Sequence, residues 1–547
     1  MAESVMLQNC FQLLPGKRFY DVRLTREKLF YNETTIESCC KPSKNHLFNL
    51  SVSDIYGAKL FRSSINEDEN AYIHIYICPV RGNKRIRRKI RFKVSGWEDL
   101  ESNIKRAEHW IKTILWLIRN PSIDTATLKD KNLPPRRKLL VLVNPSSGQG
   151  KSLKVFQKKV SPMYKESSID FELLVTEYAG HAKEIGLNLD VEQWDGIVIC
   201  SGDGLVYELV NGLMNRPDWK RAIQMPIGVI PTGSGNALCY SALYASGEPF
   251  DVTAAIFATI IGQTHKLDIC TIDTPNDRFF SFLSLTWGII SDVDLESEKH
   301  RYLGNARFTV GAVIRIIGLR TYRGRLSYLP MNNEHDEVTS SVDIPKEQLS
   351  DLDNDSPVFH SFGSPSGSFF PDENVKEERL GTDLPSSHEN AVMLQSEKPS
   401  VNDISKVYKH HQGPDTPLLL PFEKHVPANW KTIQGTFILG SSVNLSHLGP
   451  DIMAAPEARF GDGVMHITYS KAGISRLKLL SLFNKMEDGS HVEADECVTV
   501  SAQAFRLEPD LSENGTLAID GEAIPYSVVQ GQIHKGLAQV MCSKSHR

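Results

Sequence analysis

The sequence predicts an α/β domain with a doubly wound parallel sheet, joined to a mostly antiparallel β-sandwich and preceded by a small α+β module. Three observations predict this arrangement. Between about 139 and 260, continuous apolar runs alternate with helix-length segments, which is typical of strands buried on both faces of a parallel sheet. From about 265 onward, strand-like runs dominate. At the N-terminus, several alternating runs precede one amphipathic segment.

The composition is that of a globular protein whose 547 residues are too many for one core. Charged residues make up 23% and the net charge is -5, so overall charge excludes a nucleic-acid-binding polycation. The nine cysteines form no CxxC pair, which indicates reduced intracellular thiols. We find no signal peptide and no apolar run of about 18 residues. We therefore expect a cytoplasmic protein that associates with membranes only peripherally.

Residues 1–135 are expected to form the N-terminal module and its linker. Alternation predicts strands at Arg18–Thr25 and Ala71–Cys78, and helical spacing predicts a helix from Trp97 to Arg119. Strands closed by one helix resemble a pleckstrin-homology (PH) module. The basic run Lys84–Lys93 either binds anionic lipid headgroups, at about 1 kcal/mol per well-placed cation, or forms a solvated edge strand with protective charges.

The α/β domain is expected at 136–264, beyond a linker that begins with Pro134-Pro135. The predicted strands are Leu139–Val143, Phe171–Val175, Gly196–Cys200 and Ile227–Ile230. The predicted helices are Ser152–Tyr164, Ala179–Leu189 and Leu205–Met214. Ligands of such folds bind at the carboxyl ends of the strands, so the loops found there are the candidate site.

The β-sandwich domain is expected at 265–330 and 426–541, followed by a short tail at 542–547. Its strand-like runs include Thr436–Leu439, Met465–Tyr469, Cys497–Leu507 and Thr516–Ile519. Residues 331–425 are rich in Asp, Glu, Ser and Pro. Such a composition buries too little apolar surface to fold, so we expect a disordered acidic insertion there.

Three loops, each between a predicted strand and a predicted helix, carry groups suited to phosphate chemistry. Asn144–Ser152 offers small residues and a helix N-terminus for phosphate, although Pro145 stands where a P-loop has its first glycine. Ser201–Gly204 places Asp203 between two glycines, where we expect it to be exposed and able to accept a proton or hold Mg²⁺. Pro231–Asn236 suits an anion. Each loop alone is equally an ordinary turn, but three in one sheet favour a binding site.

The chain resembles known lipid kinases at several motifs. One group of motifs resembles diacylglycerol-kinase-type catalytic domains: Asn144-Pro145, Ser201–Gly204, Glu208 and Gly233–Ala237. A second group resembles sphingosine kinases: Asp292–Lys299, Arg301, Leu303-Gly304, Arg307-Phe308 and Leu319–Leu326. Asp520–Glu522 resembles the last nucleotide-site motif of that family, and the resemblance covers about 139–330 and 425–541.

The resemblance implies ATP and Mg²⁺ as cofactors, with Asp203 as the catalytic base and Asp294 as the residue that recognises the lipid headgroup. Ser201, Gly202 and Gly204 would lie beside the acceptor. The implied ATP-site residues are Asn144, Pro145, Ser146, Thr176, Glu177, Tyr178, Ala179, Gly180, Ser201, Glu208, Arg301, Arg307, Asp520, Gly521 and Glu522. Mg²⁺ would be held through the ATP phosphates, with Asp520 or Glu522 as a protein ligand. Without the resemblance, Asp294 reads as one member of a solvated acidic run.

The expected reaction is transfer of the γ-phosphate of ATP to the primary hydroxyl of sphingosine or a related sphingoid base. Two alternatives stay open: a ceramide or diacylglycerol kinase, which would not need Asp294, and a non-catalytic membrane-associated adaptor. The basic amphipathic stretch Phe308–Arg325 either docks on a membrane, binds a calcium-sensor protein, or is a core-facing helix with solvated arginines. A homodimer is a further predicted state, and nucleic acid is not a predicted partner.

Overall fold

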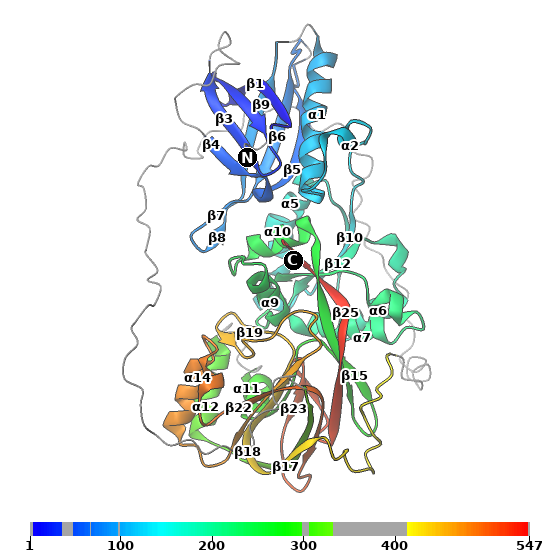
Figure 1. The fold of residues 1–547 in the computed structure, drawn as a ribbon, viewed down its shortest axis with the longest axis vertical. Helices are drawn as coiled ribbons and strands as arrows, with labels where there is room; N and C mark the ends of the chain where they lie inside the picture. Colours follow the sequence, from blue (N-terminus) through cyan, green and yellow to red (C-terminus); the bar gives the residue numbers. More distant parts are fainter. Residues whose placement is uncertain are drawn as a thin grey trace, which may run out of the picture.

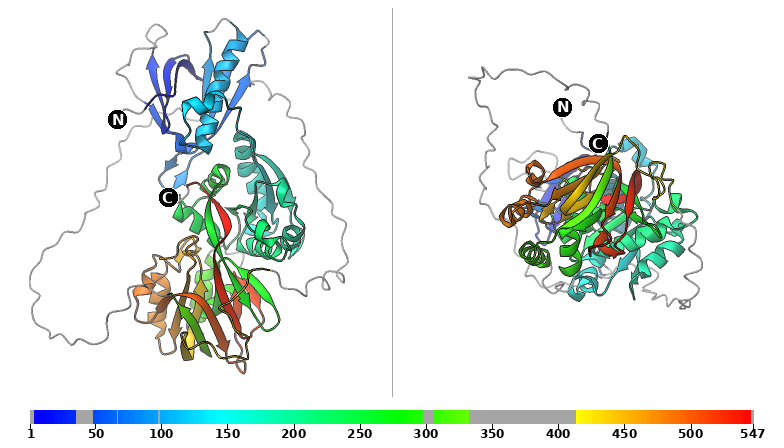
Figure 2. Two further views of the ribbon diagram at one scale, coloured as in Figure 1. Left: turned by 45° about the vertical axis from the view of Figure 1, so that its right-hand side comes forward. Right: turned by 90° about the horizontal axis from the view of Figure 1, so that it is seen from below.

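The computed structural model describes residues 4–34, 48–65, 67–96, 99–297, 306–331 and 413–544. Three parts are stacked along the long axis, with the N-terminal module at one end, the α/β domain in the middle and the β-sandwich at the other end (Figures 1 and 2). The predicted α/β domain and the predicted β-sandwich are both present.

The N-terminal module is a seven-stranded antiparallel sheet covered by one long helix. The sheet order is β4-β3-β2-β1-β9-β6-β5. The strands are β1 Leu7–Leu14, β2 Phe19–Leu24, β3 Lys28–Thr34, β4 Phe48–Ser51, β5 Ile55–Arg62, β6 Ala71–Ile77 and β9 Arg88–Val94. Helix α1, Leu100–Arg119, begins at Asp99, whose side chain accepts a hydrogen bond from the Ser102 N–H at 2.7 Å. Its apolar face, centred on Trp110 and Ile114, packs on the sheet. A short helix, α2 Thr125–Lys129, follows.

The basic run Lys84–Lys93 does not form an edge strand, so that interpretation is wrong. Strand β9 is hydrogen-bonded to β1 on one side and to β6 on the other. Its apolar residues Ile90, Phe92 and Val94 pack in the core, which leaves Lys89, Arg91 and Lys93 on the opposite face. The start of the run is β8, Lys84–Arg85, which pairs with β7, Val80–Arg81, in a hairpin that reaches toward the α/β domain (Figure 1).

The α/β domain contains four parallel strands with helices on both faces, as predicted. The order is β11-β10-β12-β13, with β10 at Lys138–Val143, β11 at Asp170–Val175, β12 at Gly196–Ser201 and β13 at Ile227–Pro231. One face is covered by α6 His181–Asn188, α7 Asp203–Met214 and α9 Ala237–Ala245. The other is covered by α4 Ser152–Val155, a π-helical turn at Phe156–Val160, α5 Ser161–Glu166 and α10 Val252–Ile261. The short helices α3 Ser147–Gly150 and α8 Trp219–Ala222 lie in connections.

The α/β domain and the β-sandwich share two long antiparallel strands. These are β14, Gln263–Asp273, and β25, Val529–Cys542. The end of β25 also pairs in parallel with β13, at Val540 and Ile227. Strand β25 therefore extends the parallel sheet of the α/β domain. The predicted domain boundaries did not include this exchange. It makes the two domains continuous (Figure 1).

The rest of the β-sandwich is antiparallel. Its strands are β15 Arg278–Ser281, β16 Ser284–Gly288, β17 Tyr322–Pro330, β18 Lys431–Val443, β21 Met465–Lys471, β22 Val498–Pro509, β23 Leu517–Ile519 and β24 Glu522–Ile524, with the small pair β19 His447–Gly449 and β20 Ile452–Met453. Three helices flank it: α11 Ile289–Ser297, α12 Ala306–Ile317 and α14 Arg476–Lys485.

Most of the predicted acidic insertion, residues 332–412, lies outside the described residues. Residues 413–425, which we placed at its end, instead lie against the β-sandwich. The buried Arg506 guanidinium donates to the carbonyls of Leu420 and Lys424, both at 2.7 Å, and the Leu418 N–H donates to Gln532 at 2.9 Å. Because Arg506 of β22 donates to these carbonyls, residues 413–425 belong to the packed β-sandwich domain and not to the insertion.

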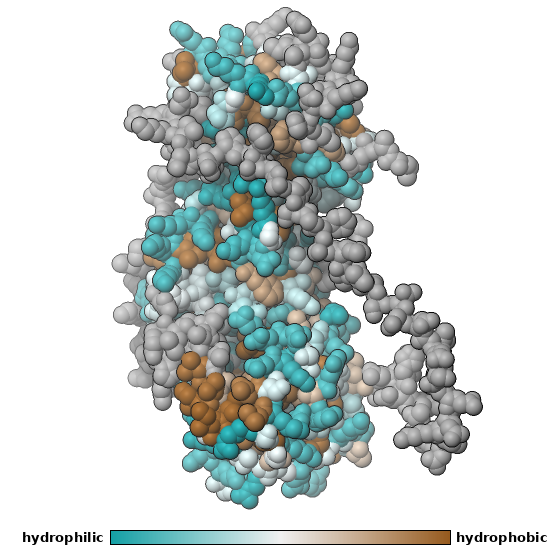
Figure 3. Space-filling model, turned by 90° about the vertical axis from the view of Figure 1, so that its left-hand side faces the viewer, coloured by the Kyte–Doolittle hydropathy of each residue, from teal (hydrophilic) through white to brown (hydrophobic). Residues whose placement is uncertain are grey.

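An apolar patch lies on helices α12 and α14. Its exposed side chains are Val310, Val313, Ile314, Ile317, Leu477 and Leu480. The most exposed of these six is Leu477, at 80%. A continuous apolar area is visible near the β-sandwich end of the face shown in Figure 3. Among the described helices, none is long and apolar enough to span a bilayer.

Candidate active site

The three glycine-rich loops meet at the carboxyl ends of β10, β12 and β13. The N–H groups of Thr232 and Gly233 donate to the Ser201 carbonyl at 3.2 and 3.1 Å, which joins the second and third loops. A methyl group added at Gly148 would lie 1.9 Å from the Thr232 carbonyl oxygen, so the first loop also packs on the third. Gly148 has φ +60°, a conformation that favours glycine. The loops therefore form one interlocked platform.

The glycines beside Asp203 serve this packing. A methyl group at Gly202 would lie 2.6 Å from the Gly235 carbonyl oxygen, and one at Gly204 would lie 2.7 Å from Oε1 of Glu522. We expected these glycines to admit a phosphate or hydroxyl. The space beside them is instead taken up by the third loop and by the turn before β24.

Asp203 is the first residue of α7, and its carboxylate lies at the N-terminus of α9. It accepts hydrogen bonds from the Ala237 N–H at 2.6 Å and the Leu238 N–H at 3.2 Å, where the helix dipole also favours negative charge. The residue is only 6% exposed, so the predicted exposure is wrong. Burial raises the pKa of Asp203 to about 6, although the two backbone hydrogen bonds oppose the rise. A carboxylate with such a pKa suits a general base near neutral pH.

Asp520 anchors the turn that faces Asp203 from the β-sandwich. Its carboxylate accepts four hydrogen bonds, from the Ser281 hydroxyl at 2.6 Å and from the N–H groups of Phe282, Leu283 and Ser284 at 3.0, 3.1 and 2.8 Å. Burial raises its pKa to about 7. Three of these bonds go to Oδ1 and one to Oδ2, so most of the carboxylate's acceptor positions are used within the protein. Of the two predicted magnesium ligands, only Glu522 has an exposed side chain.

Asp294 and Glu522 complete a group of acids between the two domains. Glu522 lies against the start of α7, because a methyl group added at Gly204 would lie 2.7 Å from its Oε1. On the other side of the turn, a methyl group at Gly521 would lie 3.4 Å from Oδ2 of Asp294, which is carried by α11. The structure therefore brings Asp203, Asp294 and the 520–522 turn to one place, although they come from three distant segments.

Asp292 does not belong to a solvated acidic run. It is buried and accepts hydrogen bonds from the hydroxyls of Tyr322 and Thr516, the latter at 2.6 Å. Arg315 of α12 lies 3.7 Å away and also pairs with Glu296. These contacts fix α11, the helix that carries Asp294.

The 176–180 loop, one part of the implied ATP site, is held by Glu208. The Glu208 carboxylate accepts from the N–H groups of Gly180 at 2.9 Å and Ala182 at 3.1 Å, so it caps α6. Tyr178 is 49% exposed and stacks on His181 with ring centroids 4.7 Å apart. Glu208 therefore shapes the 176–180 loop, whichever contacts that loop makes with a nucleotide.

Two buried polar atoms of the third loop have no hydrogen-bond partner: Oγ1 of Thr232 and Oδ1 of Asn236. In the first loop, by contrast, Oδ1 of Asn144 accepts a hydrogen bond from the Ser146 N–H at 2.9 Å. Buried polar atoms are nearly always paired, so two unpaired ones within the third loop indicate a polar ligand. These atoms and the loop N–H groups fit a nucleotide.

The two predicted phosphate-binding arginines cannot be placed. Arg301 lies outside the described residues, and only the backbone of Arg307 is described, in α12.

Sequence reasoning missed Asn211. Its Nδ2 donates to the Phe280 carbonyl at 2.9 Å, and the Phe280 N–H donates to its Oδ1 at 3.0 Å. This pair ties α7 to β15 beside the site. The available signal was a polar amide within an otherwise apolar helix.

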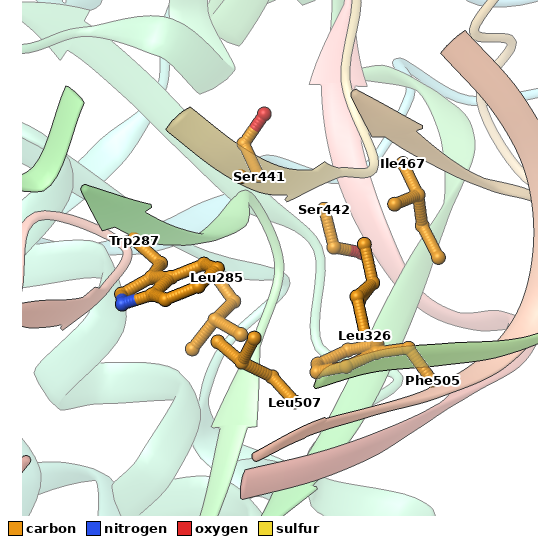
Figure 4. A pocket seen from close by; sticks show the side chains of 9 residues that line it. Leu285, Trp287, Leu326, Ser441, Ser442, Ile467, Phe505 and Leu507 are labelled. Carbon is orange, nitrogen blue, oxygen red and sulfur yellow. The ribbon is translucent and has the colours of Figure 1, made fainter. Parts of the chain in front are cut away.

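Two small cavities lie in the β-sandwich. One is between its strands, and Figure 4 shows its lining side chains, which include Trp287, Leu326 and Phe505. The other lies between α11, β18 and α14. Its lining residues are Ile290, Leu439, Ser441, Leu448, Ala454, Thr468, Leu482, Met486, His491 and Cys497. Ile290 lies one turn before Asp294 on α11, so the second cavity adjoins the acidic group.

Comparisons with known proteins agree with this architecture. Residues 138–272 match the diacylglycerol kinase catalytic domain, and residues 428–542 match the YegS C-terminal NAD kinase beta sandwich-like domain. Human sphingosine kinase 2 is 34% identical in an alignment of 552 positions, gaps included, that covers 90% of this chain and 84% of that protein. Human sphingosine kinase 1 is 38% identical over 414 residues, covering 74% and 90%, and Arabidopsis thaliana sphingosine kinase 1 is 35% identical over 393 residues, covering 71% and 68%.

Proposed function

This chain belongs to the sphingosine kinase family, and we infer from this membership that it transfers the terminal phosphate of ATP to the primary hydroxyl of sphingosine, giving sphingosine 1-phosphate and ADP. The observation that supports a working active site is the buried Asp203 carboxylate, which shares an interdomain site with Asp294 and Glu522. We propose the following roles for the residues of that site.

Asp203 acts as the general base. A primary alcohol is a poor nucleophile, and a positioned carboxylate that accepts its proton accelerates transfer by about 10²–10⁴-fold. The pKa of about 6 leaves Asp203 ionised at neutral pH yet more basic than an exposed aspartate. The α9 amides hold both carboxylate oxygens in place, so the proton is accepted at a fixed position.

Asp294 recognises the ammonium group of the sphingoid base. Helix α11 is anchored through Asp292, so Asp294 is held near Gly521 and close to the acceptor site. An amide nitrogen carries no charge, so ceramide would leave the acid without its counter-ion, at a cost of roughly 2–5 kcal/mol. The same contact disfavours diacylglycerol, which has no amine.

ATP binds on the interlocked loops. The 144–150 and 232–236 loops line the phosphate site, and Thr232 and Asn236 supply the unpaired polar atoms noted above. Arg301 and Arg307 neutralise the transferring phosphoryl group. Mg²⁺, when bound, would offset phosphate charge, and the exposed Glu522 would be its protein ligand in preference to the buried Asp520.

We propose that the lipid tail enters at the small cavity between α11, β18 and α14, which would have to widen to hold it. The cavity is mostly apolar and adjoins Asp294 through Ile290. Helix α14 lines it with Leu482 and Met486 and carries Leu477 and Leu480 on its exposed side. A lipid taken up at the patch would therefore meet the cavity along one helix.

The apolar patch on α12 and α14 rests on the cytosolic face of a membrane. Exposed apolar patches mark interaction surfaces, and a lipid substrate must be drawn from a bilayer. A calcium-sensor protein that binds α12 is the alternative occupant, and a homodimer is a further predicted state. The N-terminal module, with seven antiparallel strands and a closing helix, is proposed to be PH-like.

A kinase assay with purified protein tests these roles. Sphingosine, ceramide and diacylglycerol are compared in the same mixed micelles, and Asp203→Asn is compared with Asp170→Asn, a matched change at an exposed acid. We expect phosphorylation of sphingosine, loss of activity only in Asp203→Asn, and no preference for the neutral lipids. A preference for ceramide would contradict the substrate, and a folded protein inactive on every lipid would support the adaptor alternative.

A further inference from the structure

Helix α9 connects the proposed catalytic base to the N-terminal module. Its first two N–H groups hold the carboxylate of Asp203. Beyond its last turn, the Glu248 N–H donates to the Leu243 carbonyl at 2.9 Å, so the backbone of Glu248 is attached to the C-terminal end of the helix. A displacement of Glu248 along the helix axis would therefore move the amides that hold Asp203.

Glu248 is bound by an arginine from a different domain. Arg85, at the base of the β7–β8 hairpin, donates from Nε to Oε2 at 2.5 Å and from Nη2 to Oε1 at 2.8 Å. The two side chains are 3% and 1% exposed. This bidentate geometry fixes both the distance and the orientation of the carboxylate.

The surrounding contacts restrain the whole connection between α9 and α10. The Arg85 N–H donates to Asp251 at 2.9 Å, and Asp251 also caps α10 by accepting from the Thr253 N–H at 2.6 Å. The Arg85 guanidinium lies 3.9 Å from the centre of the Phe257 ring of α10, and the Ser543 hydroxyl donates to Glu248 at 2.6 Å.

A buried ion pair of this kind is a poor source of stability, because desolvation offsets much of the attraction. Its best-attested use is to fix a register between packed elements. Helix α9 otherwise packs mainly through apolar side chains such as Leu238, Ala242 and Leu243, and apolar contacts are non-directional. One directional contact lies in mid-helix, where the Ser241 hydroxyl accepts from the His447 N–H at 3.1 Å. The ion pair adds a bidentate, charged constraint at the C-terminal end of the helix.

We propose that Arg85 is a positioning residue for phosphoryl transfer: by fixing Glu248 it sets the position of α9 along its axis, and it thereby orients the carboxylate of Asp203. The N-terminal module is thus part of the catalytic apparatus. The inference rests on the proposed role of Asp203 as the base.

The test removes both charges together. In Arg85→Met/Glu248→Leu neither charge of the pair remains, and apolar replacement of a buried ion pair is often neutral for stability. Asp54, which lies 3.0 Å from Arg85, also loses this contact, but its side chain is 22% exposed and reaches water. We expect an unchanged melting temperature and unchanged KM values for ATP and sphingosine. The kcat should fall about tenfold, which corresponds to about 1.4 kcal/mol in the barrier. A purely structural role would lower the melting temperature and leave kcat per folded molecule intact.

The matched control breaks another ion pair between the same two domains. Arg87 binds Glu166 of α5 at 2.5 Å, away from α9. Arg87→Met/Glu166→Gln should leave kcat unchanged. An equal fall in both double variants, or no fall in Arg85→Met/Glu248→Leu, would overturn the proposal.

Two further variants keep the outcomes distinguishable. If the first double variant does not fold, Arg85→Lys decides, because lysine keeps the charge but cannot form the bidentate contact. An unchanged kcat in Arg85→Lys would then count against the proposal. If Asp203→Asn stays active, the proposed base is wrong; if Asp203→Asn is inactive while Arg85→Met/Glu248→Leu is fully active, only the positioning role fails.

Discussion

The raised pKa of Asp203 predicts a loss of kcat between pH 7 and pH 5. With a pKa of about 6, about nine-tenths of Asp203 is ionised at pH 7 and about one-tenth at pH 5. Only the ionised form accepts the proton of the lipid hydroxyl. The kcat at pH 5 should therefore be about one-tenth of its value at pH 7. An aspartate with an ordinary pKa would lose almost nothing over this range.

The assay measures kcat at saturating ATP and sphingosine from pH 5 to pH 8, in micelles of constant charge. One protonation gives a slope of one in log kcat below pH 6. A second proton on Asp520, whose pKa is about 7, would steepen that slope. A kcat at pH 5 above about half of its value at pH 7 would refute the assignment of Asp203 as the base.

Unfolding is a competing cause of lost activity, and its sign can be worked out. The folded-state pKa values of Asp203 and Asp520 are raised, so the folded protein binds more protons than the unfolded chain and these acids add stability as the pH falls through 7 and 6. His74 and His534 act in the opposite direction, because burial lowers the pKa of each to about 4 and stability is lost as the pH falls below 6.5. Circular dichroism at each pH separates these effects from chemistry.

Three further predictions concern single side chains. Asp294→Asn should raise the KM for sphingosine about tenfold or more and leave the KM for ATP unchanged, because only the ammonium contact is lost; an unchanged lipid KM would rule out headgroup recognition. Asp520→Ala should lower the free energy of unfolding by about 3–5 kcal/mol in urea denaturation, since four donors of the 281–284 loop lose their acceptor. Leu477→Glu should reduce sedimentation with phosphatidylserine vesicles but not the melting temperature, and full vesicle binding would place the membrane contact elsewhere.

The parallel sheet was predictable because its strands are buried on both faces. Leu139–Val143 and Gly196–Cys200 are continuous apolar runs, and such runs between helices have few other interpretations. Helical spacing predicted an apolar face of Ile104, Ala107, Ile111, Leu115 and Ile118 on helix α1. Ala107 and Ile111 are buried and the other three are partly buried. The buried face extends further, to Trp110, Ile114 and Leu117, because the position of the sheet decides which side of the helix is covered.

The features that could not be predicted depend on contacts between distant segments. The burial of Asp203 is produced by α9 and by the turn before β24, and nothing in Ser201–Gly204 specifies either neighbour. The motifs identified Asp203, Asp294 and Glu522 as acids of interest, but their domains are brought together by strand pairings between distant segments, β14 with β25 and β13 with β25. Likewise, Arg85 in a basic run gave no sign that its partner would be Glu248.

The parallel pairing of β25 with β13 has a consequence for synthesis of the protein in the cell. Domains usually fold in order as they leave the ribosome. Here the nucleotide-binding sheet keeps an open edge at Ile227 until Val540 has emerged, and an open strand edge is a site of mispairing. We therefore expect nascent chains to depend on chaperones for longer than the early position of this domain suggests, and a premature stop within β25 to yield aggregated product even though every loop of the ATP site is present.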